Sequence, residues 1–282
     1  MSGQVVIEAG QWQGSGAATA RRLRGGAARL AELIPADQRH TVVIEEGAGE
    51  TRNGVRNADV LQRQLHAVRE VLDQLPPGVR TVTVGGDCAV DLAPVEAALS
   101  AYGDRLAVVW FDAHADLNSP ESSPSGAFHG MVLRALIEDG PGGPDELRAR
   151  HRVSADRVVL AGARSLDPGE QKLVEQRGIR HLTVEHLADP GPLVAAVRAT
   201  GADAVYVHID LDVLDPRHFP AVGTPEPDGL GVDQLLAAVR ALTDTFTLAG
   251  IALTEYERTD DPEREEAVLR RIVDGLFAPD RA

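Results

Sequence analysis

Several features that would assign the chain to common protein classes are scarce or missing. The 282 residues include one cysteine, Cys88, so an intrachain disulfide is excluded and the cytoplasm is the expected compartment. No stretch approaches the roughly 20 apolar residues of a membrane span, and no signal peptide is expected near Met1. Acidic residues outnumber basic ones by 43 to 28, and the net charge of -15 argues against a nucleic acid or an anionic membrane as partner.

The remaining composition, 43% hydrophobic and 25% charged, is that of a globular protein. Segments typical of strands and of helices alternate along the chain. The expected strands are residues 5–7, 41–44, 81–84, 106–111, 157–160, 181–184, 205–211 and 248–253. The expected helices are residues 17–34, 58–75, 89–100, 129–138, 169–177, 192–200, 232–243 and 263–276. This order predicts one domain over residues 1–282, a three-layer α/β/α architecture with a mostly parallel, doubly wound sheet.

Acidic residues and histidine cluster directly after two of the expected strands. One run contains Asp112, His114 and Asp116, and the other contains Asp210 and Asp212. Alternate residues of an extended segment point the same way, so each run can face one cavity at the carboxyl ends of the strands. Buried carboxylates need a balancing cation, and four aspartates are too many for one metal. The two runs therefore predict a pair of divalent metals such as manganese.

Either run alone is equally well explained as a turn or a capping cluster. Together they resemble two motifs of the ureohydrolase (arginase–agmatinase) family, whose enzymes split a guanidino group with a two-manganese centre. Residues 112–116 resemble the family's DAHxD motif and residues 210–216 its DxDxxDP motif, and the resemblance extends from Gly85 to Glu255. It implies that Asp112 and Asp210 bridge both metals, that Asp116 binds one metal, and that His114 and Asp212 bind the other.

One position departs from the family pattern. The family's first motif ends in Gly-Gly-Asp-His and the histidine binds metal, whereas residues 85–88 read Gly-Gly-Asp-Cys. Either Cys88 is a small buried residue beside a weak or absent metal, or it is a thiolate ligand. A thiolate would add a negative charge and would suit zinc better than manganese. We expect a retained but weakened metal site at Cys88, within an arginase-like branch of the family.

Two segments resemble the parts of arginases that bind the amino-acid end of the substrate. The loop 118–130 resembles one that ends in SGxxHG, which implies that Asn118 and Ser125 contact the α-carboxylate and that His129 passes protons to the leaving amine. An ordinary surface loop is the alternative. Residues 163–170 resemble the RDxDPGE stretch, which implies that Asp167 and Glu170 receive the α-amino group. The same residues also form a good helix start, and both descriptions can hold.

Two further positions concern the guanidino group. Thr224, in a Gly-Thr-Pro tripeptide, matches a family threonine near that group, although a simple turn is the alternative. Glu255 matches the glutamate that pairs with the guanidinium. The family continues with Val-Asn-Pro where residues 256–258 read Tyr-Glu-Arg, so Glu257 is a competing candidate. His208 precedes Asp210 by two residues, and we expect at most a hydrogen bond behind the site from it.

The resemblance implies a hydrolase with two Mn²⁺ ions and a small guanidino substrate. His129, Asp116 and Glu255 are the expected catalytic residues. L-arginine or Nω-hydroxy-L-arginine would yield urea or hydroxyurea together with ornithine. The alternatives are an agmatinase or another guanidino or formimino hydrolase, and a metal-poor relative that binds a ligand or partner for regulation. A trimer or hexamer of identical subunits is carried over from the family as an expectation.

Overall fold

The sheet is built from short apolar segments of the chain. The computed structural model describes residues 4–137, 145–260 and 262–277, and within them eight parallel strands form one sheet. They are β1 (Val5–Ala9), β2 (Gln38–Thr41), β3 (Thr81–Gly85), β4 (Leu106–Phe111), β5 (Val158–Ala161), β6 (Arg180–Leu182), β7 (Ala204–Asp210) and β8 (Thr247–Thr254). Their spatial order is β2-β1-β3-β8-β7-β4-β5-β6, which confirms the expected doubly wound sheet.

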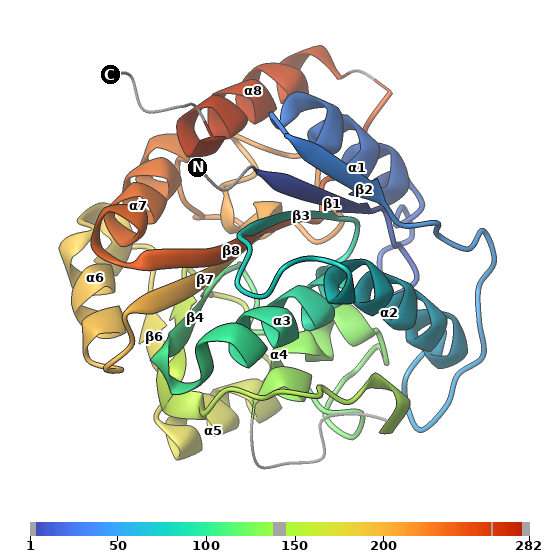
Figure 1. The fold of residues 1–282 in the computed structure, drawn as a ribbon, viewed down its shortest axis with the longest axis horizontal. Helices are drawn as coiled ribbons and strands as arrows, with labels where there is room; N and C mark the ends of the chain where they lie inside the picture. Colours follow the sequence, from blue (N-terminus) through green and yellow to red (C-terminus); the bar gives the residue numbers. More distant parts are fainter. Residues whose placement is uncertain (1–3, 138–144, 261, 278–282) are drawn as a thin grey trace.

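Helices cover both faces of this sheet (Figure 1). They are α1 (Arg22–Leu33), α2 (Ala58–Asp73), α3 (Leu92–Tyr102), α4 (Val132–Leu136), α5 (Pro168–Arg177), α6 (Gly191–Arg198), α7 (Val232–Thr245) and α8 (Glu263–Phe277). The core on one face includes residues of α2, α3, α4 and α5, and the core on the other face includes residues of α1, α6, α7 and α8. Within β4, Trp110 belongs to the first core and Phe111 to the second, as the two-residue period of a strand requires.

Several elements begin at residues other than those expected, and three of these differences have a clear structural cause. The strand expected at 41–44 lies at Gln38–Thr41, because pairing with β1 continues only to the amide of Val42, which donates to Glu8, and Val43 is exposed. The helix expected from residue 17 begins at Arg22, since turns occupy the residues before it. The helix expected at 129–138 is a 3-10 turn, η3 (Phe128–Met131), followed by α4, and residue 138 lies outside the described residues.

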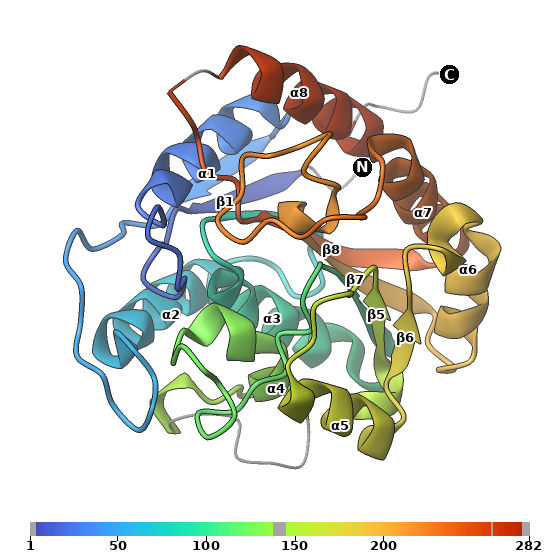
Figure 2. The same ribbon diagram turned by 180° about the vertical axis from the view of Figure 1, so that it is seen from behind.

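The four central strands β3, β8, β7 and β4 are neighbours, so the segments that follow them emerge side by side. Figure 2 shows this edge with the segment between β7 and α7 in front. Parallel sheets of this kind bind ligands outside the carboxyl ends of their strands. None of the helices within the described ranges combines the length and apolarity that a membrane crossing requires.

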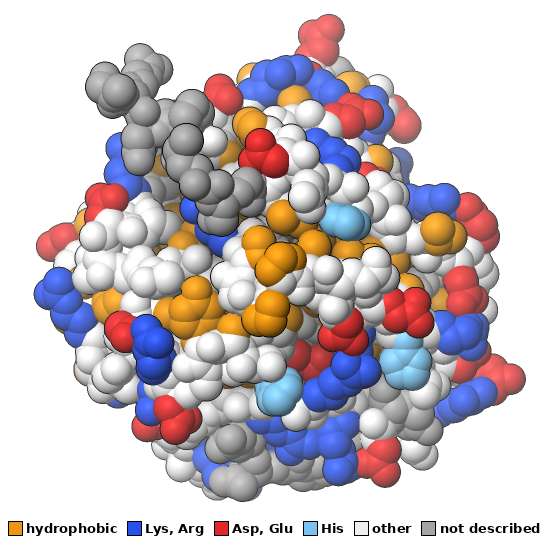
Figure 3. Space-filling model, viewed as in Figure 1, with side chains coloured by type: hydrophobic (Ala, Val, Ile, Leu, Met, Phe, Trp, Pro, Cys, Tyr) orange, Lys and Arg blue, Asp and Glu red, His pale blue; other side chains and the backbone are white. Residues whose placement is uncertain are grey.

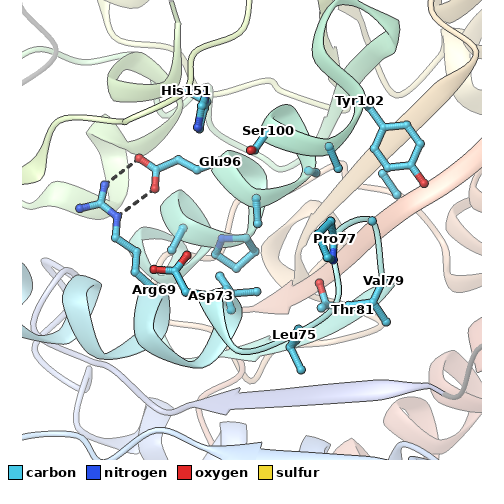
Figure 4. Close-up of a pocket in the computed structure, with 18 of the residues that line it drawn as sticks. Arg69, Asp73, Leu75, Pro77, Val79, Thr81, Glu96, Ser100, Tyr102 and His151 are labelled. Atoms are coloured by element: carbon cyan, nitrogen blue, oxygen red, sulfur yellow. Dashed lines mark hydrogen bonds and ion pairs between the residues drawn. The ribbon is translucent and has the colours of Figure 1, made fainter.

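The opposite edge of the sheet carries a pocket of about 270 Å³ (Figure 4). The pocket lies among the end of α2, residues 75–79 and α3. Figure 3 shows hydrophobic side chains near the middle of the molecular face that is also seen in Figure 1. Arg69 and Glu96 form an almost fully buried ion pair on the wall of the pocket, with Arg69 Nε and Nη2 donating to the carboxylate at 2.9 and 2.7 Å. The residues that line this pocket include none of the expected site residues.

The Arg69–Glu96 pair joins α2 to α3 and should matter for stability. Arg69→Met leaves the Glu96 carboxylate buried without its cation, which costs about 3–5 kcal/mol. The exposed pair of Arg105 and Asp203 is a matched control, and Arg105→Met should cost less than about 1 kcal/mol. Urea unfolding followed by circular dichroism measures both losses. Equal losses in the two variants would contradict a stabilising role for the buried pair.

Candidate metal centre and active site

Four neighbouring strand ends bring the expected acidic residues together. Cys88 follows β3, Asp112 follows β4, Asp210 ends β7 and Glu255 follows β8. Candidate ligand atoms lie within 4.8 Å of one another in three groups, which are Cys88–Asp112–Asp116–His208, Cys88–Asp210–Glu255 and Asp112–His114–Asp212. The structure therefore brings all the residues that the sequence suggested as metal ligands into one buried cluster.

Asp112 and Asp210 are held by the same local turn. Asp112 Oδ1 accepts the amide of His114 at 2.6 Å, and Asp210 Oδ1 accepts the amide of Asp212 at 2.7 Å. Aspartate forms such turns readily because its short side chain reaches the backbone two residues ahead. The second oxygen of Asp112 accepts Trp110 Nε1 at 3.1 Å, and that of Asp210 accepts Cys88 Sγ at 3.1 Å. Each carboxylate is thus fixed at the end of its strand.

His114 lies between two of the aspartates. Its Nδ1 is 3.0 Å from Asp212 Oδ2 and 3.4 Å from Asp112 Oδ1. Burial disfavours the charged imidazole, but the two carboxylates outweigh burial and raise the pKa of His114 far above its usual value. Burial likewise opposes the charged form of Asp212, but His114 outweighs it and lowers the pKa of Asp212 to about 2. The charged form of His114 and the neighbouring carboxylates therefore stabilise one another.

Asp116 and Glu255 have backbone conformations that side chains rarely adopt. Their φ angles are 54° and 61°, in the left-handed region, and such strain is typical of functional sites. Asp116 Oδ2 and Glu255 Oε2 are buried and have no hydrogen-bond partner within the part of the chain that the structure describes. A buried carboxylate oxygen without a donor is costly unless a cation or ligand binds it. These two atoms therefore indicate where such a group belongs.

The cluster is electrostatically unfavourable by itself. Burial, followed by the charges of Asp212 and other acids, raises the pKa of Asp112 and Asp210. Burial and the charge of Asp112 raise the pKa of Asp116. Burial and the charge of Asp210 raise the pKa of the Cys88 thiol. Perturbations of this size at one edge of a sheet are characteristic of a functional site.

Glu255 and His129 are in direct contact. His129 Nδ1 lies 3.1 Å from Glu255 Oε1, which also accepts the amide of Cys88 at 3.3 Å. The other ring nitrogen, Nε2, accepts the amide of Gly16 at 3.3 Å. Glu257, the competing candidate, lies beside Gly223 and Thr19 instead. Of the two glutamates, Glu255 is the one whose carboxylate oxygen lies within 4.8 Å of Cys88 and Asp210.

The residues expected at the amino-acid end of the substrate lie on two loops that meet. Asn118 Nδ2 donates to Asp167 Oδ2 at 2.8 Å, whereas Ser125 is exposed and its Oγ accepts the amide of Ala127. Glu170 is buried, and its two carboxylate oxygens accept the amides of Leu117 and Asp167 at 2.8 and 2.9 Å. This is the capping box at the start of α5. Glu170 thereby attaches that helix to the segment after Asp116.

Thr224 extends the site from the segment after β7. Its Oγ1 donates to Asp212 Oδ2 at 3.1 Å. This is the oxygen that also faces His114 Nδ1. The Gly-Thr-Pro tripeptide is therefore more than a surface turn, because it places a hydroxyl against the acidic cluster.

The sequence motifs did not predict that the segment after β1 contacts the site. Gln11 Nε2 and the amide of Gly14 donate to Asp87 at 3.0 and 2.8 Å. A side-chain carbon on Gly14 would lie 2.3 Å from Asp87 Oδ1, so this close approach requires glycine. Burial and the charge of Glu255 raise the pKa of Asp87 to about 7. The sequence feature that could have indicated this segment is the set of three closely spaced glycines, Gly10, Gly14 and Gly16, directly after a strand.

Comparisons with known proteins agree with this geometry. A model described as the arginase family matches residues 8–275. The arginase of Staphylococcus aureus (strain MSSA476) is 30% identical over 271 residues, which cover 92% of this chain and 89% of that protein. The native arginase structure of Bacillus caldovelox superimposes with a TM-score of 0.83, at 26% identity and 100% coverage of both chains.

A more distant structural neighbour is formimidoylglutamase of Bacillus subtilis subsp. subtilis str. 168. Its TM-score is 0.70 at 18% identity, over 98% of this chain and 87% of that chain. This similarity shows a shared fold. With the family model matching nearly the whole sequence and a curated arginase at 30% identity, the chain belongs to the arginase family.

Proposed function

We propose that the chain hydrolyses the guanidino group of L-arginine, giving L-ornithine and urea, with divalent metals held by the aspartate cluster. The observation that carries the proposal is the convergence of buried carboxylates on four adjacent strand ends, within reach of Glu255 and His129. Membership of the arginase family and the curated arginase relatives support the same reaction.

The donor set fits divalent metals. Asp112, His114 and Asp212 offer carboxylate oxygens and an imidazole, which suit manganese. The unpartnered oxygen of Asp116 lies in the same cluster. Bound there, a metal pair would lower the pKa of a coordinated water and neutralise the acids. We infer two metals because Asp112 belongs to two different groups of candidate ligand atoms, one with Asp116 and the other with His114 and Asp212.

Glu255 is suited to hold the guanidinium. Its Oε1 is engaged by His129 and by the amide of Cys88, while Oε2 is buried and has no partner among the described residues. A guanidinium N–H would satisfy that oxygen through a charge-assisted hydrogen bond. The amide of Glu255 donates to the carbonyl of Gly86 at 2.7 Å, which fixes the strained backbone. Glu255 would therefore orient the guanidinium carbon toward the cluster.

His129 is suited to move a proton. Burial disfavours its charged form, but the hydrogen bond and the charge of Glu255 raise the pKa of His129 above its usual value. The side chain is 17% exposed, so the ring borders both the cluster and solvent. The imidazole can carry a proton to the nitrogen that leaves as ornithine forms, once Nε2 exchanges the amide of Gly16 for a proton.

The loops that carry Asn118, Ser125 and Asp167 are suited to bind the α-carboxylate and α-amino groups. They lie at the rim, with Asn118 and Asp167 already in contact. Asp167 has a carboxylate for the ammonium group, while the oxygens of Glu170 are occupied by backbone amides. Agmatine lacks the α-carboxylate, so a site that recognises both groups favours the amino acid.

Glu255→Gln should abolish most of the activity while a matched change nearby does not. Loss of a charged hydrogen-bond partner costs about 1.5–3 kcal/mol, and misorientation adds about 100-fold, so kcat/KM for arginine should fall by at least about 100-fold. Glu257→Gln is the matched control, because Glu257 is buried close by but faces Gly223. Urea release from manganese-loaded protein measures both. A larger loss for Glu257→Gln would transfer the role to that residue.

Substrate choice should depend on Asp167. We expect arginine to be hydrolysed in preference to agmatine, and Asp167→Ala to raise KM for arginine about 10-fold or more through loss of a charged hydrogen bond. The same variant should hydrolyse agmatine as well as the unmodified protein does. Parallel assays with arginine, Nω-hydroxyarginine, agmatine and guanidinobutyrate measure this. An equal loss on arginine and agmatine would show that Asp167 only supports the loop.

The metal-free protein should lose stability as pH rises. Asp112, Asp116 and Asp210 have pKa values above their usual value near 4, so the folded chain keeps protons that the unfolded chain releases. This contribution is complete below the unfolded pKa of about 4. It is lost as pH rises through the pKa values of the folded chain. Asp87 behaves in the same way, and its pKa in the folded chain is about 7. We expect the melting temperature after chelator treatment to be higher near pH 5 than near pH 7.5.

A substitution within the cluster provides the control for that pH dependence. Asp210→Asn should stabilise the metal-free protein near pH 7.5 by about 0.5–2 kcal/mol and reduce the difference between the two pH values. Asp244→Asn, at an exposed position on α7, should do neither. Thermal unfolding of the three proteins gives the comparison. A pH effect unchanged by Asp210→Asn would exclude Asp210 as one of its sources.

A further inference from the structure

The side chain that stands out at the metal centre is His208, which the sequence placed behind the site. It is fully buried, on the same face of β7 as Asp210. One of its ring nitrogens lies within 4.8 Å of ligand atoms of Cys88, Asp112 and Asp116. The chain lacks the histidine that the family carries at position 88, and an imidazole reaches the same cluster from a different strand.

The orientation of the His208 ring is fixed from two sides. Nδ1 lies 2.8 Å from Asp91 Oδ2, and the other oxygen of Asp91 accepts the hydroxyl of Tyr206. The ring stacks on Trp110, with centroids 3.4 Å apart and planes at 6°. Trp110 in turn donates to Asp112. A carboxylate that accepts Nδ1–H leaves Nε2 with its lone pair, and metal-binding histidines are commonly oriented in this way.

Among the residues that the structure describes, only a marginal hydrogen-bond donor faces Nε2. Thr254 Oγ1 is 3.5 Å from it, at the long limit of a hydrogen bond, and the same hydroxyl is 3.3 Å from the carbonyl oxygen of Ile209. Thr254 Oγ1 is also 3.3 Å from Cys88 Sγ. A lone pair buried beside a thiol and two carboxylates is satisfied best by a cation. A ring that served only for packing would need no nitrogen at that position.

We propose that His208 binds metal directly, together with Cys88, Asp112 and Asp116, so that β7 supplies the imidazole that the segment after β3 does not provide. The donor set is then a thiolate, an imidazole and two carboxylates. It differs from the carboxylate and imidazole set of Asp112, His114 and Asp212. Sulfur and imidazole ligands favour zinc. The two metal positions of this chain therefore differ in preference, with zinc favoured at the one that contains Cys88 and His208.

The inference deepens the proposed metal-dependent function, and metal binding is measured without arginine. Metal-free protein receives one equivalent of Zn²⁺, and X-ray absorption at the zinc edge identifies sulfur and imidazole neighbours. We expect both in the unmodified protein and in His114→Asn, which removes the other histidine of the cluster. Cys88→Ser should lose the sulfur signal and keep imidazole. The thiol proton is released to the buffer as zinc binds.

Variants of His208 and Tyr206 test whether His208 binds the metal itself or only supports the residues that do. His208→Asn combined with His114→Asn should lose the imidazole signal and weaken zinc binding by more than about 100-fold, since outer partners alone cost about 10–100-fold. Tyr206→Phe removes a hydroxyl from Asp91 without touching the metal, and should weaken zinc binding by no more than about 10-fold. Chelator competition gives the dissociation constants.

The outcomes distinguish this inference from the proposed reaction. The inference is overturned if zinc in His114→Asn has a sulfur neighbour but no imidazole neighbour. It is also overturned if zinc in the unmodified protein has no sulfur neighbour. That decision does not require His208→Asn to fold. Urea release from arginine is assayed separately with manganese. If zinc has sulfur and imidazole neighbours but no urea is released, the proposed reaction alone is overturned. If urea is released but zinc has only oxygen neighbours, this inference alone is overturned.

Discussion

Repulsion between buried carboxylates is the constraint on which this structure depends. The strand order places β3, β8, β7 and β4 side by side, so acids at their carboxyl ends must meet. Helices cover both faces of the sheet, and the aspartates at its edge are buried. The cluster persists because backbone amides and His114 hold its carboxylates, and because a cation can complete it. Such a cluster lowers the stability of the fold at this edge, as is common where side chains are arranged for function.

Backbone geometry supplies the rigidity that such a cluster needs. Asp116 and Glu255 have positive φ angles, and each is held by main-chain hydrogen bonds from another segment. The carbonyl of Asp116 accepts the amide of Arg134 at 3.0 Å, and the amide of Glu255 donates to Gly86 at 2.7 Å. Neighbouring segments support these conformations, and in both residues one carboxylate oxygen has no partner among the described residues. Main-chain hydrogen bonds to other segments thus help to fix the positions of Asp116 and Glu255.

Local pattern was enough to predict the sheet and the acidic runs. An apolar strand followed by alternating acids, as in residues 106–116, leaves little choice about where those side chains point. The prediction placed the edge strand at residues 41–44 because the residues of Gln38–Thr41 are polar. Their pairing with β1 nevertheless makes them the strand. The contact between His129 and the segment near Gly16 joins residues 113 positions apart. The environment of His208 likewise depends on Asp91, 117 positions away, and no local period encodes such distances.

Under the proposed function, the residues suited to the reaction are buried and those suited to substrate choice include an exposed one. Cys88, Asp112, Asp210 and Glu255 lie in the interior on strand ends, where a change of one atom alters packing and charge together. Ser125 lies at the exposed rim, on a loop that tolerates variation. Glu170 couples the two regions, because its carboxylate binds the amide of Leu117, next to Asp116, and caps the helix that follows Asp167. Glu170 therefore links the exposed loop to the segment that carries Asp116, and under the proposed function it would position both.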